Sequence, residues 1–530
     1  MSLNETAADL PRDIELLQQM VRQRDEQLAR QSAEAVLLQA FIDKLKLQIA
    51  RLKRQRFGAS SERQTGELAQ LELLLEELQT NQAENTARDE LTTGKPPERR
   101  RPVRKPLPDH LPREPQIHTC DGGCPACGGA DLIEIGQDVC EQLELVPQRF
   151  KVIRHIRPKY KCRACQSITQ QPAPARPIAK GLAGPGLLAH VLVAKYQDHL
   201  PLYRQSEMYG RHQVDLPRST LADWVGECAA LLAPLTQVLG RYVKQGAKLH
   251  ADDTPIQVLR PGKGKTGTAR LWAYVRDDRP MGDEAAPAVW LQYSPDRKGE
   301  HVHRHLADFE GVLQADGYAG YGALYETSRI SEAACWAHAR RKFFELNDLR
   351  PGPTCQEALA RIARLYEIER SIRGQPPPDR LATRQTEAVP LLSDMKQWLE
   401  RTLGELSAKS ALAQTIRYSL TRWQALTRYA HDGRLEIDNN AAERAIRQVA
   451  LGRKNYLFVG SDAGGERAAA IYSLLGTAKL NGIDPEGYLR QVLARIGEHP
   501  INRVDKLLPW NISATTPMTA DSKGAVVQRS

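Results

Sequence analysis

The sequence KLHADDTPIQVL, residues 248–259, decides the fold of the central part of the chain, because it begins a series of strand-like segments. Two more apolar runs follow, ARLWAYVRDD and AVWLQY, then the helix-like HVHRHLADFEG and a fourth strand-like run within GVLQADGYAGY. EAACW reads as a further strand and HARRKFFEL as a helix. This alternation predicts a mixed sheet with helices packed against it.

Two aspartates stand out in this series. If the first and fourth strands lie side by side, Asp252 and Asp316 meet at strand ends. By its element order the region resembles a ribonuclease-H-like α/β fold. Carboxylates held close together favour cations between them, and two Mg²⁺ ions (or Mn²⁺) about 3.5–4 Å apart suit the attack on a phosphodiester.

A third carboxylate is expected from the segment LEIDNNAAERAIRQVALGRK. A helix that begins near residue 440 carries Glu443, with Arg447 four residues later on the same face. Lys454 joins that face if the helix continues so far. These basic groups are predicted to hold DNA phosphates, and composition alone leaves Asp438 as a competitor of Glu443.

The stretch from about residue 354 to 430 is helix-like and predicts a helical insertion into the α/β domain of residues 245–480. Just before it, Cys335 and His338 in CWAH invite a metal interpretation. Two ligands are too few for a metal site, and a core position suits Cys335. We therefore predict phosphate contacts from the polar residues of this helix: His338, Arg340, Arg341 and Lys342.

Two Cys-x2-Cys pairs predict a zinc ribbon over residues 116–178. Their four thiolates suit one tetrahedral Zn²⁺, on which such small ribbons depend for folding. Cys120 and Cys140 are spare candidates. The predicted ligands are Cys124, Cys127, Cys162 and Cys165. Between the pairs, a segment without acids predicts phosphate contacts from Lys151, Arg154, Arg157, Lys159 and Lys161.

The regions on either side of the ribbon are predicted to be helical. Residues 184–240 read as helices, two of them resembling a helix-turn-helix, with a purely structural bundle as the equal alternative. Residues 10–56 carry apolar heptads, including Ile42, Leu45 and Ile49, which predict a coiled coil joining two protomers; the alternative is one amphipathic helix packed on its own chain. A short acidic helix and a basic, Pro-rich linker fill residues 57–115.

The composition agrees with a DNA partner. A net charge of +10 favours a polyanion, and no long apolar run predicts a membrane span. The start lacks a signal-peptide pattern, and nine cysteines in uneven positions suit thiols or metal ligands in a reducing compartment, so we expect a cytoplasmic protein. Residues 481–512 are expected to form a C-terminal helical segment and 513–530 a disordered tail.

Taken together, these features resemble a known family, the transposases of insertion-sequence family sixty-six, of the Asp-Asp-Glu class. The resemblance covers about residues 10–510. It is carried by HADDTP, ADGYAGY, CWAHARRKFF and DNNAAERAIRQVALGRKNYLFVGSDAGGERAAAIYSL, with RFGASSER, the cysteine pairs, LPLYRQ and STLADWV upstream. It implies that Asp252, Asp316 and Glu443 form a metal-binding catalytic triad on a ribonuclease-H-like core.

Two departures from the family pattern are visible. Asp252-Asp253-Thr254 replaces the usual Asp-Glu-Thr, and Gln448 replaces a Pro. Because successive side chains of a strand point to opposite faces, only one of the two aspartates can face the metals, and we choose Asp252.

The resemblance implies a bacterial, nucleoid-associated DNA transposase that binds the ends of an insertion sequence and performs metal-dependent hydrolysis and strand transfer, with accessory proteins as possible partners. It also implies that residues 245–480 are the catalytic domain and that the helical insertion is able to cover the active site or the DNA ends. The alternatives are a structure-specific nuclease on the same core and a non-catalytic zinc-ribbon regulator.

Overall fold

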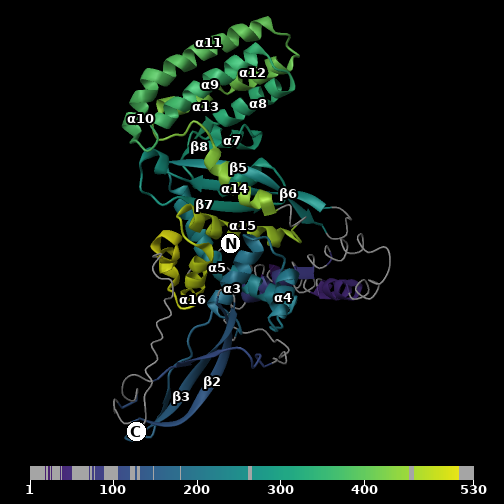
Figure 1. Cartoon of the computed structure of the whole chain (residues 1–530), viewed down its shortest axis with the longest axis vertical. Helices are drawn as coiled ribbons and strands as arrows, with labels where there is room; N and C mark the ends of the chain where they lie inside the picture. Colours follow the sequence, from purple (N-terminus) through teal and green to yellow (C-terminus); the bar gives the residue numbers. More distant parts are fainter. Residues whose placement is uncertain are drawn as a thin grey trace.

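The computed structural model describes residues 106–119, 126–127, 132–146, 149–179, 181–260, 266–452 and 459–512, and parts of 18–88, of which 39–49 and 78–88 are helical runs. The molecule is elongated: a long β-hairpin extends from one end, a mixed sheet lies in the middle, and helices form the other end (Figure 1). None of the helices described is both long and apolar enough to cross a membrane. Most of the predicted coiled coil and the predicted tail lie outside the described residues.

The hairpin belongs to a small sheet with β3 at its centre. β3 is parallel to β1 and antiparallel to both β2 and β4. The sheet begins at Arg113, so the last residues of the predicted linker form its first strand. The strands are β1 (Arg113–Ile117), β2 (Leu132–Val146), β3 (Arg149–Cys162) and β4 (Ile168–Gln170).

Three helices follow: α3 (Pro185–Tyr196), α4 (Leu202–Arg211) and α5 (Arg218–Lys244). Glu144 of β2 accepts hydrogen bonds from the backbone N–H groups of Gly186 (3.0 Å) and Leu187 (2.6 Å), and so joins the hairpin to the start of α3. The second helix of the predicted helix-turn-helix is not short, because α5 continues through Pro234 and packs against β6 and β7. This finding favours the structural bundle over a groove-reading module.

The central sheet has the order β7-β6-β5-β8-β9. β5 is antiparallel to β6 and parallel to β8, which confirms the predicted neighbourhood of the first and fourth strands. β6 is buried along LWAYV, as expected of an inner strand covered on both faces. The strands are β5 (Lys248–Leu259), β6 (Thr266–Arg276), β7 (Ala288–Ser294), β8 (Gly311–Ala315) and β9 (Ile330–Ala334).

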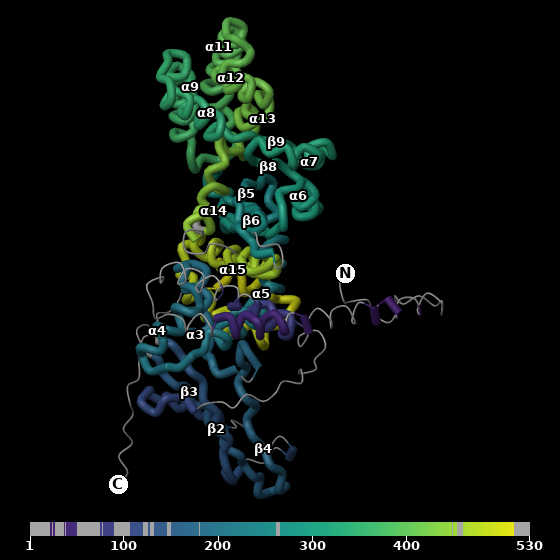
Figure 2. The backbone as a smooth tube through the Cα atoms, turned by 90° about the vertical axis from the view of Figure 1, so that its right-hand side faces the viewer, coloured from purple at the N-terminus to yellow at the C-terminus, as the bar shows by residue number. Residues whose placement is uncertain are grey.

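Helices cover this sheet and protect its edge. The edge strand β7 gives its N–H groups to side chains of α15: Leu291 donates to Ser473 Oγ (2.8 Å) and Val289 to Thr477 Oγ1 (3.1 Å). α14 packs across β5 and β6. Figure 2 shows α14 and α6 on either side of these strands. The helices are α6 (Gly299–His305), α7 (Gly322–Glu326), α14 (Asn440–Gly452), α15 (Asp462–Leu480) and α16 (Pro485–Arg495).

The predicted insertion between β9 and α14 is helical and has an apolar core of its own. Buried ion pairs connect it to the sheet: Glu436 accepts from Arg380 (2.8 Å) and lies 3.5 Å from Lys248 at the start of β5. Its helices are α9 (Pro353–Ser371), α10 (Pro377–Thr383), α11 (Val389–Glu405), α12 (Ala411–Thr421) and α13 (Trp423–Thr427). The helix α8 (Trp336–Leu349), which precedes the predicted span, shares the same apolar core.

The N-terminal helical residues pack on the same chain. Ile42, Leu45 and Ile49 of the predicted coiled-coil seam are buried against Leu75 and Leu78. For this part of the seam, the structure has the alternative arrangement, a helix packed within its own protein.

The run 78–88, with Glu76 just before it, is in turn held against the body of the molecule by buried charges. Glu76 pairs with Lys195 of α3, and Glu84 pairs with Arg467 of α15 at 2.7 Å. The backbones meet so closely at Gly226 of α5 that an added Cβ would lie 2.4 Å from Thr80 O.

Candidate functional site

The three predicted acids converge on one end of the central sheet. The last paired residues of β5 and β8 are Ala251 and Ala315, so Asp252 and Asp316 are the next residues on two adjacent parallel strands. Glu443 lies in the first turn of α14, which packs on β5. Asp252 and Glu443 border a cavity of about 500 Å³, whose lining is Asp252, Thr254, His338, Arg341, Asn440, Glu443, Arg444, Ile446, Arg447 and Ala450.

The electrostatics of Asp252 reflect this convergence. Burial raises the pKa of Asp252 to about 7, and the negative charges of Asp316, Asp253 and Glu443 act in the same direction. The backbone N–H of Asp253 donates to Asp252 Oδ1 at 2.8 Å and opposes the shift. A carboxyl group with such a pKa binds a cation readily, because the cation relieves both the burial and the repulsion.

The neighbouring aspartate has a different environment. Asp253 forms ion pairs with Arg270 (3.0 Å) and Arg297 (2.7 Å), so its charge is already compensated. Arg297 also lies 3.6 Å from Asp316 and stacks over the Tyr318 ring. Arg297 is not predictable from the sequence, because its position beside the acids follows from the path of the loop after β7 and not from a local pattern.

Asn439 is a second residue whose role the sequence does not predict. Its side chain donates to Ala251 O (2.7 Å) and contacts His250 Nδ1 (3.2 Å), while its backbone N–H donates to Cys335 Sγ (3.1 Å). Its carbonyl accepts from Glu443 N at 3.3 Å. Asn439 therefore fixes the start of α14 relative to both β5 and α8.

The competitor Asp438 has other partners, namely Asn440 and, through a side-chain hydrogen bond, Tyr366 of α9. Its carboxylate accepts from the backbone N–H and the side-chain amide of Asn440, at 3.1 and 2.7 Å. It does not border the cavity that Asp252 and Glu443 line.

The CWAH segment contributes to the same cavity. Cys335 Sγ, one His338 ring nitrogen and one Glu443 oxygen lie within 4.8 Å of one another. Burial raises the pKa of Cys335 to about 12, which makes it a neutral thiol. Arg341 lies 3.4 Å from Glu443 Oε2, so this predicted phosphate contact reaches the cavity.

The other predicted phosphate contacts on these two helices have different positions. Arg447 borders the cavity. Arg340 is exposed, stacks over the Phe344 ring and does not line it. The helix α14 ends at Gly452, and Lys454 lies outside the described residues.

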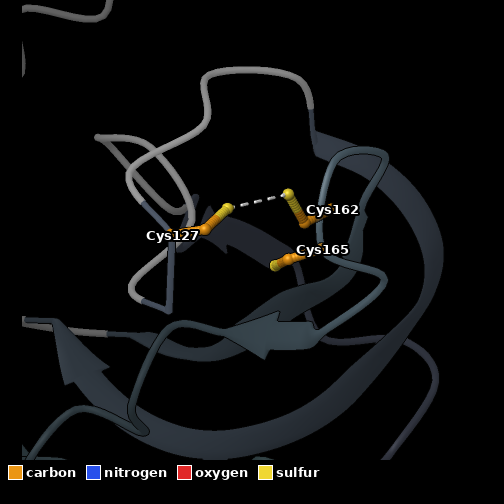
Figure 3. Close-up of side chains that lie close together, drawn as sticks. All are labelled: Cys127, Cys162 and Cys165. Carbon is orange, nitrogen blue, oxygen red and sulfur yellow. Dashed lines mark hydrogen bonds between the residues drawn. The ribbon is translucent and has the colours of Figure 1, made fainter.

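Three of the four predicted zinc ligands also come together. Figure 3 shows Cys127, Cys162 and Cys165 facing a common centre, with Cys127 Sγ and Cys162 Sγ 3.6 Å apart. Thiolates about 2.3 Å from a tetrahedral zinc lie roughly 3.8 Å from each other, so these positions fit the ion. Cys124 lies outside the described residues. Cys140, one of the spare candidates, instead accepts a hydrogen bond from Arg176 (2.6 Å).

The basic residues of β3 have acidic partners on the adjacent strands. Lys151 pairs with Glu114 (2.7 Å) and Lys159 with Asp138 (2.7 Å). Arg154 lies 3.3 Å from Glu141, and Arg157 lies 3.5 Å from Asp138. In the part of the chain that the structure describes, Lys161 has no ion pair. The segment without acids is therefore partly neutralised across the sheet, and it stays positive because Arg157 and Lys159 share Asp138.

Comparison with known families gives matches along most of the chain. A family model described as "Transposase IS66 family" matches residues 180–467. Three further models match other regions: "Transposase C of IS166 homeodomain" over 44–115, "zinc-finger binding domain of transposase IS66" over 121–166, and "IS66 C-terminal element" over 473–510.

Similar proteins are found in Sinorhizobium fredii (strain NBRC 101917 / NGR234). Uncharacterized protein y4hP is 43% identical over 500 residues, which is 90% of this chain and 90% of the relative. Uncharacterized protein y4qI is 37% identical over 529 residues, covering 95% of this chain and 98% of the relative.

Proposed function

The chain belongs to the IS66 family of transposases, and from this premise we propose that it binds the ends of a bacterial insertion sequence, hydrolyses the phosphodiester there and transfers the freed strand into target DNA. One observation supports this most directly: Asp252 and Glu443 border a single cavity together with Arg341 and Arg447. Acids and guanidinium groups around one space suit a DNA phosphate and its counter-ions.

The proposed core is ribonuclease-H-like. Three antiparallel strands, β7, β6 and β5, continue into the parallel strands β8 and β9, and this order supports the assignment. Ligands in sheets of this kind bind beyond the carboxyl ends of parallel strands. Asp316 directly follows β8, and Asp252 lies where the parallel pairing of β5 with β8 ends.

Asp252, Asp316 and Glu443 are the proposed ligands of two Mg²⁺ (or Mn²⁺) ions, since clustered carboxylate oxygens match the preference of these ions. When bound, the ions would acidify the attacking water and neutralise charge on the phosphate. Arg341 and Arg447 would bind and orient the DNA backbone beside the acids. Arg297 would hold the Asp253 carboxylate in an ion pair, so that Asp252 is the one of the two aspartates available to bind a metal ion.

The reaction would proceed in two in-line displacements. Water first attacks the phosphorus at the element's end, and the P–O bond to the 3′ oxygen breaks, which leaves a 3′-hydroxyl. That hydroxyl then attacks a phosphorus of target DNA, a new P–O bond forms, and the target's own 3′ oxygen leaves with a proton. Neither step requires a covalent bond between protein and DNA.

The remaining proposals concern the rest of the chain. A structural Zn²⁺ held by Cys127, Cys162 and Cys165, with Cys124 as the fourth ligand, would order the hairpin for DNA contact. A dimer is proposed through heptads in residues 10–35, because Ile42, Leu45 and Ile49 are already covered by their own chain. Small proteins encoded by the same element are possible partners.

The test is the mobility of a marked element in cells, with its neighbouring genes present, for the wild type and Asp316→Asn at matched protein levels. We expect transposition to disappear while binding to the element's ends persists. Mobility that survives the substitution would exclude Asp316 from the chemistry and favour a regulator. In vitro, a supplied 3′-hydroxyl end separates the two enzymes: a transposase joins it to target DNA, whereas a nuclease only cuts.

A further inference from the structure

His338 and Glu443 meet where the first turns of two helices come together. His338 lies in the first turn of α8 and Glu443 in the first turn of α14. The hydrogen bond from Asn439 N to Cys335 Sγ (3.1 Å) ties the starts of these helices to each other. The distance between the His338 and Glu443 side chains is therefore set by the two helix backbones and by the buried Asn439–Cys335 hydrogen bond, and not by a contact between the two side chains.

Two atoms at this meeting point lack partners. His338 Nδ1 and Glu443 Oε1 are both buried, and neither has a hydrogen-bond partner among the residues that the structure describes. They lie 3.7 Å apart, which is too far for a hydrogen bond between them. Leaving a buried donor or acceptor without a partner costs about 1–3 kcal/mol, so a third atom between them is expected.

The separation fits two ligands of one ion. With metal–ligand bonds of about 2.1 Å, two ligands on the same ion lie roughly 3–4 Å apart. The third member of the cluster, Cys335, is already used, because its sulfur accepts the hydrogen bond from Asn439 N. The other oxygen of Glu443 faces Arg341 at 3.4 Å, so Oε1 is the atom available on the histidine side.

We propose that His338 Nδ1 is a further protein ligand of the divalent ion that Glu443 holds, which makes the metal centre one of three carboxylates and one imidazole. The inference rests on the proposed function, since it extends the ligand set of the same site. It also replaces the sequence-based prediction of a phosphate contact for His338. An imidazole in the ligand set favours Mn²⁺ over Mg²⁺, because nitrogen is a softer ligand than oxygen.

The test uses Mn²⁺ alone, added to the full-length, zinc-loaded protein without DNA. Pulsed electron paramagnetic resonance of the bound Mn²⁺ should show a coupling to a directly bound ¹⁴N nucleus. Labelling the histidines with ¹⁵N should convert this signal to that of ¹⁵N, which needs no substitution and therefore carries no risk to folding.

Substitutions then identify the histidine. His338→Gln should abolish the nitrogen coupling and weaken Mn²⁺ binding by at least about tenfold, since removing even an outer partner of a metal ligand costs that much. The matched control is His301→Gln, because His301 clusters with Asp296 and Glu300 in the one other described group that joins a histidine to acids. We expect the coupling to persist in this control.

The failures are distinguishable. If Mn²⁺ binds and binding is lost in Asp316→Asn, but the wild type shows no nitrogen coupling, then His338 is not a ligand and the proposed function stands. If Mn²⁺ binding is unaffected by Asp316→Asn, the carboxylate centre itself is wrong, and the inference falls with it.

Discussion

Among the described residues, two of the clusters of candidate metal-ligating side chains, the thiols and the acids, are supported very differently. The thiols of Cys127, Cys162 and Cys165 lie on a thin sheet, with two of the three cysteines exposed. Apolar side chains of that sheet also face solvent: Ile117, Ile133, Ile135, Val139 and Ile168. The acids Asp252 and Glu443 instead stand on a thick core that includes Leu271 and Trp272 of β6.

This difference teaches where a metal contributes to folding and where it contributes to chemistry. A sheet that buries little apolar surface depends on a structural ion for its stability. A sheet covered by helices folds without one and can therefore hold like charges close together, as the raised pKa of Asp252 indicates. The first cluster is predicted to fail structurally when it is damaged, and the second only functionally.

The largest effect is expected from Glu443→Gln. Strand cleavage should fall by at least roughly 10³-fold, because the change removes a charge at the metal centre, while the melting temperature stays unchanged. Cleavage of a labelled end and thermal unfolding measure the two. Asp438→Asn is the matched control, because Asp438 lies outside the cavity, and it should retain activity to within about tenfold. A lower melting temperature for Glu443→Gln would contradict the prediction that damage to the acid cluster affects function and not folding.

The next effect concerns the thiol cluster. Cys162→Ser should lose its zinc and weaken binding to the element's ends by about 30- to 100-fold, because the hairpin loses its order. Zinc content and a binding titration are the measurements, and the thermal transition of the central sheet should remain. Cys140→Ser, on the same sheet but outside the cluster, should bind zinc normally. Equal damage in both variants would contradict the assignment.

The pH dependence of Mn²⁺ affinity tests the acid cluster further. Burial raises the pKa of Asp252 to about 7, so in the metal-free protein the Asp252 carboxyl group stays protonated up to neutral pH. Below pH 7, a metal ion must displace this proton in order to bind. Mn²⁺ affinity should rise about tenfold per pH unit up to pH 7 and then level. Between the ordinary aspartate pKa near 4 and pH 7, Asp252 is protonated in the folded, metal-free state and ionised in the unfolded state. The contribution of Asp252 to the free energy of unfolding therefore decreases as the pH rises.

Calorimetric titration with Mn²⁺ between pH 5.5 and 8 measures the profile, and chelator-treated protein melted over the same range checks the sign. A flat affinity profile below pH 7 would show that Asp252 is not the acid that the ion displaces.

The smallest effect compares a cation at the cavity, Arg447, with one held in an ion pair on the hairpin, Lys159. Arg447→Ala, at the cavity, should reduce the salt dependence of DNA binding by about one phosphate contact. Lys159→Ala should reduce it less, because Asp138 already pairs with this side chain at 2.7 Å. Binding titrations at several salt concentrations compare the two slopes. A larger change for Lys159→Ala would assign the main phosphate contacts to the hairpin.

Local patterns were sufficient for the elements that present the acids. The order of the apolar runs predicted that β5 and β8 are neighbours, and the helix start near residue 440 predicted the place of Glu443. Both are short-range signals, in which apolar spacing and side-chain periodicity carry the information.

Contacts between distant segments were not predictable. Asn439 joins residues nearly 190 positions away, and Arg297 reaches Asp253 across the sheet. The acids that pair with basic side chains of β3 lie on other strands, so the sequence showed the basic residues without their partners. Pro234 normally interrupts a helix, yet burial against the sheet carries α5 through it.

The run 78–88, with the pairs Glu76–Lys195 and Glu84–Arg467, has a consequence for hybrid proteins. If an N-terminal module were exchanged between related transposases, Glu76 and Glu84 would lose their partners on α3 and α15 unless the recipient also carried Lys195 and Arg467. A buried charge left alone costs about 3–5 kcal/mol, enough to unfold many domains. The N-terminal segment and the body of the chain are therefore expected to be inherited together, and functional chimaeras should retain all four residues.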